Sequence, residues 1–213
     1  MKDGGFDTPA NGSPAYKNRA SRVLAALASS PGLGFHGLVT LPLGGLLWAA
    51  SYPGLHPIGL LAVLALLVLG GLWCLRLMLA LAQRAGLNLG RWFLAPGLVV
   101  AAAGVYLSGL PVRLRFALAR TEFQAALSDL QAGGVLEERK QVPVPNRIGS
   151  YEITYAYQVG GDVLFYERWG AWTDDAGFAY LPEGPSSHLE NGNFERPSFR
   201  WLGGEWYAWT ASW

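Results

Sequence analysis

The sequence predicts a membrane protein in which a transmembrane region of about three α-helices precedes a small extracytoplasmic α+β domain with antiparallel hairpins. The first observation is that no aspartate or glutamate occurs between Asp7 and Glu122. The second is that this stretch contains three long apolar runs, and the third is that later segments alternate between apolar and polar residues. Because a carboxylate at the centre of a bilayer costs roughly 2.5 to 3.5 kcal/mol, so long a gap indicates a membrane region.

The charges of the two halves are opposite. Residues 1–121 contain ten basic and two acidic residues, a net charge of +8, and residues 122–213 contain six basic and thirteen acidic residues, a net charge of −7. The basic residues flank apolar segments, where they bind lipid headgroups, and the aqueous half is acidic, so we expect no binding to nucleic acid. The single cysteine, Cys74, excludes an intramolecular disulfide and a cysteine-based zinc site.

The transmembrane region is expected at residues 31–111, after a disordered basic tail at residues 1–30. Its spans are expected near 32–52, 58–82 and 92–112, each within the roughly 17 to 25 residues that a spanning helix needs. The first run could instead be a cleaved signal peptide, because it follows a basic cluster and ends in small residues. We favour its retention as a span, since it exceeds the roughly 7 to 15 residues of a signal core.

The positions of lysine and arginine predict the orientation. With three spans, six basic residues lie on the same side of the membrane as the N-terminus, and three lie on the opposite side, just after the third span. The first set is Lys17, Arg19, Arg22, Arg76, Arg84 and Arg91, and the second is Arg113, Arg115 and Arg120. By the positive-inside rule, the N-terminus is cytoplasmic and the C-terminal domain is extracytoplasmic. The expected location is the plasma membrane, as a multi-pass protein in contact with the lipid bilayer.

Residues 112–213 are expected to form a helix followed by an antiparallel β domain. The helix is predicted over 112–132, because apolar residues from Phe116 to Leu130 share one face at helical spacing and two glycines follow. We expect this helix to continue from the third span, with Pro111 marking a kink.

About five strands are expected to pack against this helix, and a first hairpin follows Tyr151. Its strands alternate with a period of two and turn at Gly160-Gly161. In that register Tyr155 faces Tyr166, an aromatic pair that stabilises the hairpin.

A second hairpin is predicted near the C-terminus, after a short strand at 177–181. Its two strands flank Gly203-Gly204. This turn predicts that Trp201 faces Trp206.

Two segments of the C-terminal half resemble a known pattern. The sequences GFAYLPEGP at Gly177–Pro185 and LGGEWY at Leu202–Tyr207 are similar to those of small uncharacterised actinobacterial integral membrane proteins. In that family, apolar spans and an arginine-bearing stretch like Val112–Phe116 precede a compact β-rich tail. The resemblance covers the third span to the C-terminus and implies location and layout, with no activity or functional residue to transfer.

The aromatic side chains of the C-terminal domain are the strongest indication of function. The candidate interaction surface consists of five tryptophans: Trp169, Trp172, Trp201, Trp206 and Trp209. Aromatic faces stack on sugar rings and line protein interfaces, so a membrane protein, an envelope protein or a glycan is a candidate partner. The alternative is that a small domain without disulfides uses these rings for its core, and we favour the core for most of them.

The polar candidates are Glu167, Asp174, Asp175 and His188. Adjacent aspartates could bind a divalent cation, although a solvated turn is the commoner role, and a histidine with a carboxylate could act as acid and base. No serine-hydrolase, zinc-protease or phosphate-binding-loop motif occurs. We therefore assign no catalytic residue, metal or cofactor.

Three functions stay open. We favour a non-enzymatic module that presents an aromatic-rich β domain at the outer membrane surface for binding. The second is a cell-envelope hydrolase or transferase that uses the carboxylates of the domain. The third is a structural subunit of a membrane complex.

Overall fold

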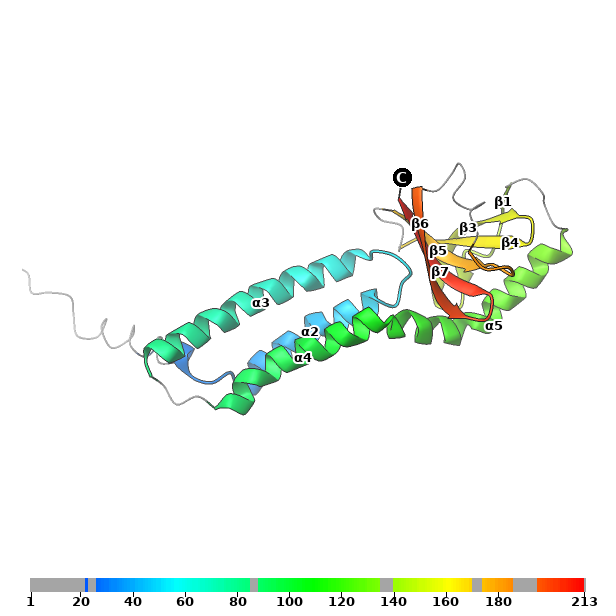
Figure 1. Ribbon diagram of the computed structural model, residues 1–213. Helices are drawn as coiled ribbons and strands as arrows, with labels where there is room; N and C mark the ends of the chain where they lie inside the picture. The colour runs from blue at the N-terminus through cyan, green and yellow to red at the C-terminus, as the bar shows by residue number, and fades with distance from the viewer. Residues whose placement is uncertain are drawn as a thin grey trace, which may run out of the picture.

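The computed structural model describes residue 22 and residues 26–84, 88–134, 140–169, 174–185 and 195–212. A bundle of apolar helices extends from one side of a β domain, and one further helix runs from the bundle beneath the sheet (Figure 1). Most of the predicted basic tail lies outside the described residues.

Three helices form the bundle: α2 at Leu33–Ala49, α3 at Pro57–Ala82 and α4 at Leu89–Ser108. Helices α3 and α4 are long and apolar enough to cross a membrane, by length and composition. Helix α2 has 17 residues, so at about 1.5 Å per residue it is shorter than the roughly 30 Å of a hydrocarbon core. The first apolar run thus forms a shorter helix than predicted.

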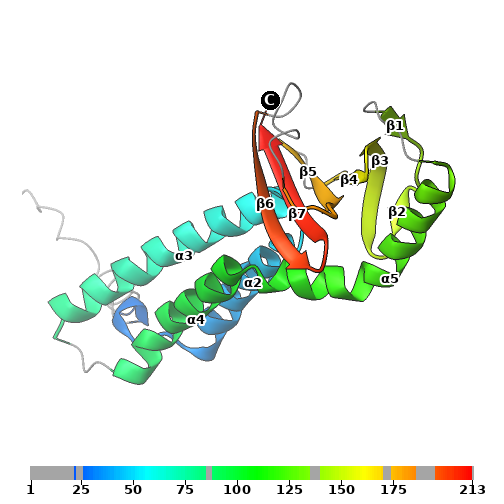
Figure 2. The same cartoon turned by 45° about the vertical axis from the view of Figure 1, so that its right-hand side comes forward.

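Capping side chains and small residues shape the bundle. The backbone N–H of Ile58 donates to Nδ1 of His56 at 3.2 Å, which caps α3 at its start. A Cβ on Gly59 would lie 3.2 Å from Cβ of Ala49, so glycine permits close contact between α2 and α3. Helix α2 packs against both other helices, whereas α3 and α4 lie apart over most of their lengths (Figures 1 and 2).

The break between α4 and the next helix differs from the prediction. Helix α5 extends over Leu110–Ala132, and a single residue, Gly109, separates it from α4. Gly109 has a φ of 68°, a left-handed conformation that glycine adopts without the steric cost of a Cβ. Pro111 lies in the first turn of α5, where a missing N–H costs nothing, so the break is at Gly109 and the predicted kink at Pro111 is wrong.

The C-terminal half forms an antiparallel sheet. Its strands are β1 at Lys140–Val142, β2 at Arg147–Ile148, β3 at Tyr151–Val159, β4 at Asp162–Glu167, β5 at Asp175–Tyr180, β6 at Glu195–Gly203 and β7 at Trp206–Ser212. The order is β1-β3-β4-β5-β7-β6, with β2 paired to β3. The five expected strands are present, and the two short strands β1 and β2 are additional.

The two hairpin predictions have different outcomes. Tyr155 pairs with Tyr166 across the first hairpin, as predicted. In the second hairpin Trp201 pairs with Tyr207 and Gly203 with Trp206, so the predicted pairing of Trp201 with Trp206 is wrong. The register shifts between Trp201 and Gly203, as at a β-bulge, so the strands do not follow the register of a simple two-residue turn.

Aromatic rings from α5 and one face of the sheet form the main core. The ring of Phe123 lies 5.0 Å from that of Phe178, 5.4 Å from that of Phe165 and 5.7 Å from that of Trp206, measured between centroids. These residues are fully buried. Helix α5 therefore packs against the sheet as the periodicity predicted. A second buried cluster on the other face includes Leu164, Tyr166, Ala179, Leu181 and Trp209.

Candidate functional site

The predicted tryptophans occupy two kinds of environment. Trp206 and Trp209 are each 1% exposed and belong to the two core clusters. Trp169 and Trp201 are 44% and 55% exposed. Trp172 lies outside the described residues. The described members therefore divide between core and surface, and the exposed pair lies apart in the chain, Trp169 in the turn after β4 and Trp201 in β6.

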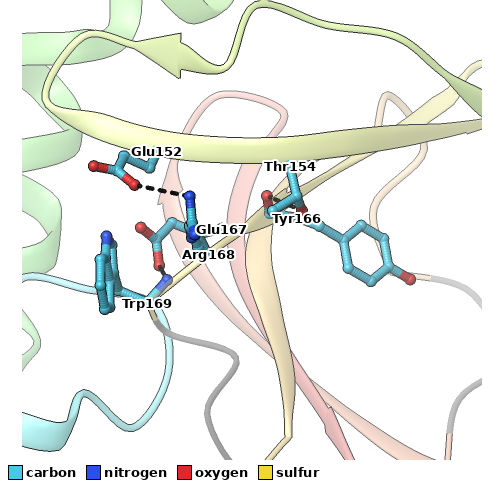
Figure 3. Close-up of polar contacts among 6 residues, drawn as sticks. All are labelled: Glu152, Thr154, Tyr166, Glu167, Arg168 and Trp169. Atoms are coloured by element: carbon cyan, nitrogen blue, oxygen red, sulfur yellow. Dashed lines mark hydrogen bonds and ion pairs between the residues drawn. The ribbon is translucent and has the colours of Figure 1, made fainter.

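Glu167 is a structural carboxylate at the end of β4. It is completely buried, and its Oε2 accepts a hydrogen bond from the backbone N–H of Trp169 at 2.8 Å (Figure 3). Arg168, the residue between them, forms an exposed ion pair with Glu152 at 3.8 Å (Figure 3). Glu167 thereby orders the turn that presents the exposed Trp169 ring.

The other polar candidates that the structure describes lie at the start of β5, the strand that pairs with β4. Asp174 borders a cleft between the helices and the sheet, and Asp175 is the first residue of β5, paired with Ala211. His188 falls outside the described part of the chain. Within the residues that the structure describes, no three His, Cys, Asp or Glu side chains are grouped so that they could hold a metal ion.

Arg115 on α5 connects the bundle to the β domain. One of its guanidinium nitrogens, Nη1, donates to Oγ of Ser51 at 3.0 Å, and Nη2 donates to the Tyr52 hydroxyl at 3.2 Å. On the domain side, Nε donates to Oγ of Ser150 at 2.8 Å and Nη2 to the Ser150 carbonyl at 2.7 Å. The guanidinium also lies 4.4 Å from the ring centroid of Tyr151. Since Ser51 and Tyr52 belong to the loop between α2 and α3, one side chain binds both parts of the molecule.

A group of aromatic rings surrounds this connection. The ring of Tyr52 lies 4.5 Å from that of His56 and 5.1 Å from that of Trp48, and His56 lies 6.2 Å from Trp169. The Tyr151 hydroxyl donates to the Ser51 carbonyl at 3.1 Å. We call Arg115 with these rings and serines the junction.

The junction shifts the ionisation of two of its members. Burial, and secondly the Arg115 charge, lower the pKa of His56 below its ordinary value of 6.5, so the neutral imidazole is favoured. Burial raises the pKa of Tyr151 far above its ordinary value of 10.0, although Arg115 acts in the opposite direction. Tyr151 is therefore a hydrogen-bond donor at neutral pH, and Arg115 carries the positive charge of the junction.

Beside the junction, a cleft of about 350 Å³ separates the end of the bundle from the sheet. Its sheet wall contains Asp174, Ser198, Arg200 and Thr210. Ser198 pairs with Thr210 across β6 and β7 and Arg200 pairs with Ala208, so this wall is the end of the sheet face that α5 covers elsewhere. The opposite wall comes from α2, α3, their loop and α4, and is mainly apolar.

The sequence reasoning missed the roles of Arg115 and Arg200. A local signal for Arg115 did exist, because it lies three residues after Val112 and four before Ala119, and both of these are buried. An arginine at the edge of a buried helix face indicates that its guanidinium group has a hydrogen-bond acceptor nearby. Arg200 had no such signal, since its position depends on the left-handed break at Gly109.

No family model matches the chain, and the searches of curated proteins and of solved structures found no significant match. The resemblance to actinobacterial membrane proteins therefore stays a prediction.

Proposed function

We propose that this chain is an integral membrane protein that holds its β domain at the outer surface of the plasma membrane, as a binding module. The exposed side chains of α3 support insertion in lipid: Leu67 and Val68 are 66% and 72% exposed. In water such a surface would favour aggregation, whereas hydrocarbon solvates it.

The contacts at the junction are the main support for this proposal. Only Gly109 separates α4 from α5, and Arg115 ties the loop between α2 and α3 to Ser150. Two connections, one covalent and one by hydrogen bonds, fix the domain against the end of the bundle. A domain held in this way presents Trp169 and Trp201 at a defined height above the bilayer, where lipid headgroups, a membrane protein or envelope glycan are accessible.

The enzymatic alternative has less support among the described residues. Glu167 is buried and bonded to the turn after β4, and Asp174 is the single carboxylate bordering the cleft in the part described. An acid–base mechanism needs a second group within reach of the same substrate. The structural-subunit alternative stays a prediction, because it depends on partners of the helices.

Membrane topology tests the proposal directly. In a Cys74→Ser background, Glu183→Cys places a thiol on an exposed turn of the β domain, and Arg84→Cys places one at the opposite end of the bundle. An impermeant maleimide should label Glu183→Cys in intact cells, and Arg84→Cys only after lysis. Release of the protein from membranes by alkaline carbonate, or the opposite labelling pattern, would contradict the proposal.

A further inference from the structure

The bundle contains a second cavity, and the two cavities lie on the same faces of three helices. The second cavity, of about 230 Å³, is apolar and lies between α2, α3 and α4. The residues of α3 that line the two cavities include Gly59, Val63, Leu66, Gly70 and Trp73. Their spacing of four, three, four and three residues describes one stripe along the helix.

The other two helices show the same alignment. On α2, Phe35 and Val39 line the second cavity and Leu46 lines the first, at offsets of four and eleven residues from Phe35. On α4, Ala95 lines the second cavity and Tyr106 the first, eleven residues apart. Eleven residues make about three helical turns, so the lining residues stay on one face.

These stripes place the two cavities in line along the bundle, and we call the aligned pair the groove. Helix α2 forms its floor and contacts both walls, while α3 and α4 stand apart as the walls themselves (Figure 2). Along α2, seven residues separate Val39 from Leu46, which is about 10 Å at 1.5 Å per residue. The groove is open to the surroundings, since Leu60 and Tyr106 on its walls are each 42% exposed.

Polarity changes along the groove. The end beside the sheet contains Arg200 and Asp174, whereas the lining of the second cavity, deeper in the bundle, is almost wholly apolar. A Cβ on Gly109 would lie 2.6 Å from Nη1 of Arg200, so glycine at this position leaves room for the guanidinium at the cleft. Within the described residues Arg200 forms no ion pair. The cleft thus offers a cation and an anion at one end of the groove, and the other end is apolar.

We propose that this groove binds one phospholipid molecule whose headgroup carries both a phosphate and an amine. Arg200 binds the phosphate, Asp174 binds the ammonium group, and an acyl chain follows Val63 and Leu66 into the second cavity. Arginine suits phosphate because its planar donors match the oxygen geometry. The inference rests on the proposed function, because the lipid enters from the bilayer. A helix of a second copy could fill the apolar part, but it would leave the charges of the cleft without partners.

Native mass spectrometry of the full-length protein in detergent tests this site. The probes are dioleoyl phosphatidylethanolamine, dioleoyl phosphatidylglycerol, dioleoylglycerol and free phosphoethanolamine. We expect one bound phosphatidylethanolamine, weaker phosphatidylglycerol, and no retention of the other two. Arg200→Gln should reduce the affinity for both phospholipids about tenfold, the usual effect of losing a charged hydrogen bond. Asp174→Asn should reduce the affinity for phosphatidylethanolamine alone.

Two further variants separate this site from general lipid adhesion. Arg113→Gln removes an exposed arginine of α5 outside the cleft and should leave binding unchanged. Val99→Trp fills the second cavity and should reduce the affinity for both phospholipids equally, whatever their headgroup.

Equal binding of all three lipids, or equal effects of Arg200→Gln and Arg113→Gln, would overturn the inference. Retention of free phosphoethanolamine at similar affinity would overturn the role of the acyl groove, and a lipid-free dimer disrupted by Val99→Trp would show that a second copy occupies it. Carbonate extraction of the membranes from which the protein is purified keeps the two proposals distinguishable. Protein that stays in the membrane without binding lipid contradicts this inference alone, whereas protein released by carbonate contradicts the membrane anchor.

Discussion

Strand β4 and helix α3 are both rich in apolar residues, yet they differ in what surrounds them. All six residues of β4 are buried, including Val163 and Phe165, whereas Leu61 on α3 is 64% exposed. The sheet obtains its burial from α5 and from neighbouring strands, while α3 receives little from the other described residues. The comparison teaches that the β domain carries its own core, whereas α3 leaves much of its apolar surface exposed. Four predictions test this contrast.

The largest effect is expected for Phe123→Ala. Its ring contacts five aromatic neighbours in the core between α5 and the sheet, so the cavity should reduce the free energy of unfolding of the β domain by about 3 to 5 kcal/mol. Denaturant titration of the detergent-solubilised protein, followed by tryptophan fluorescence, measures it. Leu118→Ala, at a site 85% exposed, is the control and should change the free energy by less than about 0.5 kcal/mol. Equal losses in the two variants would break the contrast.

Arg115→Gln should loosen the junction and leave the domain core intact. The change removes charged hydrogen bonds to Ser51, Tyr52 and Ser150, each of a kind that contributes roughly 1.5 to 3 kcal/mol. Hydrogen exchange of the loop between α2 and α3 should accelerate at least about tenfold, while exchange in β4 stays the same. Arg113→Gln, also on α5 but exposed, is the matched variant and should leave the loop protected. Faster exchange in both regions would mean that the two halves fold as one unit.

Gly177→Ala should destabilise the sheet through its backbone. An added Cβ would collide with the carbonyl oxygen of Phe165 on the neighbouring strand, so we expect a loss of about 1 to 3 kcal/mol. At Gly161 the nearest atom to an added Cβ is Cγ of Pro182 at 3.7 Å, an ordinary contact, and Gly161→Ala should be tolerated. The same denaturant titration compares the two. Tolerance of both substitutions would show that the strands can separate without loss of stability.

The smallest effect is the pH dependence of the junction. Because the pKa of His56 in the folded protein lies below its ordinary value of 6.5, folding favours the neutral ring. The contribution of His56 is therefore complete above pH 6.5 and decreases as the pH falls below that value. Protection of the loop between α2 and α3, corrected for intrinsic exchange rates, should decline on acidification in the native protein and less in His56→Gln. A decline of the same size in both would assign the pH effect to other groups.

The sequence predicted those parts of the fold that depend on local patterns. Helical spacing from Phe116 and alternation from Tyr151 depend on neighbours a few residues away, so the α5 face and the first hairpin could be predicted. The second hairpin could not, because a register shift after Trp201 replaces the simple turn at the glycine pair. Such a bulge is stabilised by packing of the whole sheet and has no fixed local signature.

The candidate site was harder to predict than the fold. Arg115 meets Ser51 across 64 residues of sequence, and the cleft combines residues from the bundle and from β6. Proximity of this kind depends on how the halves pack, which periodicity does not encode. The sequence identified aromatic residues as important but could not divide them between core and surface, since Trp206 and Trp201 have the same chemistry and differ in the strand and the face of the sheet on which they lie.

The hydrogen bond from Tyr151 to Ser51 joins residues separated by 100 positions in the chain. A ribosome that adds about 5 to 20 residues per second needs at least several seconds to pass from one to the other. During that interval the loop between α2 and α3 is complete while its partners on the domain have yet to be synthesised. The order of synthesis therefore makes the junction a late step of folding, completed only after all three helices of the bundle have been synthesised.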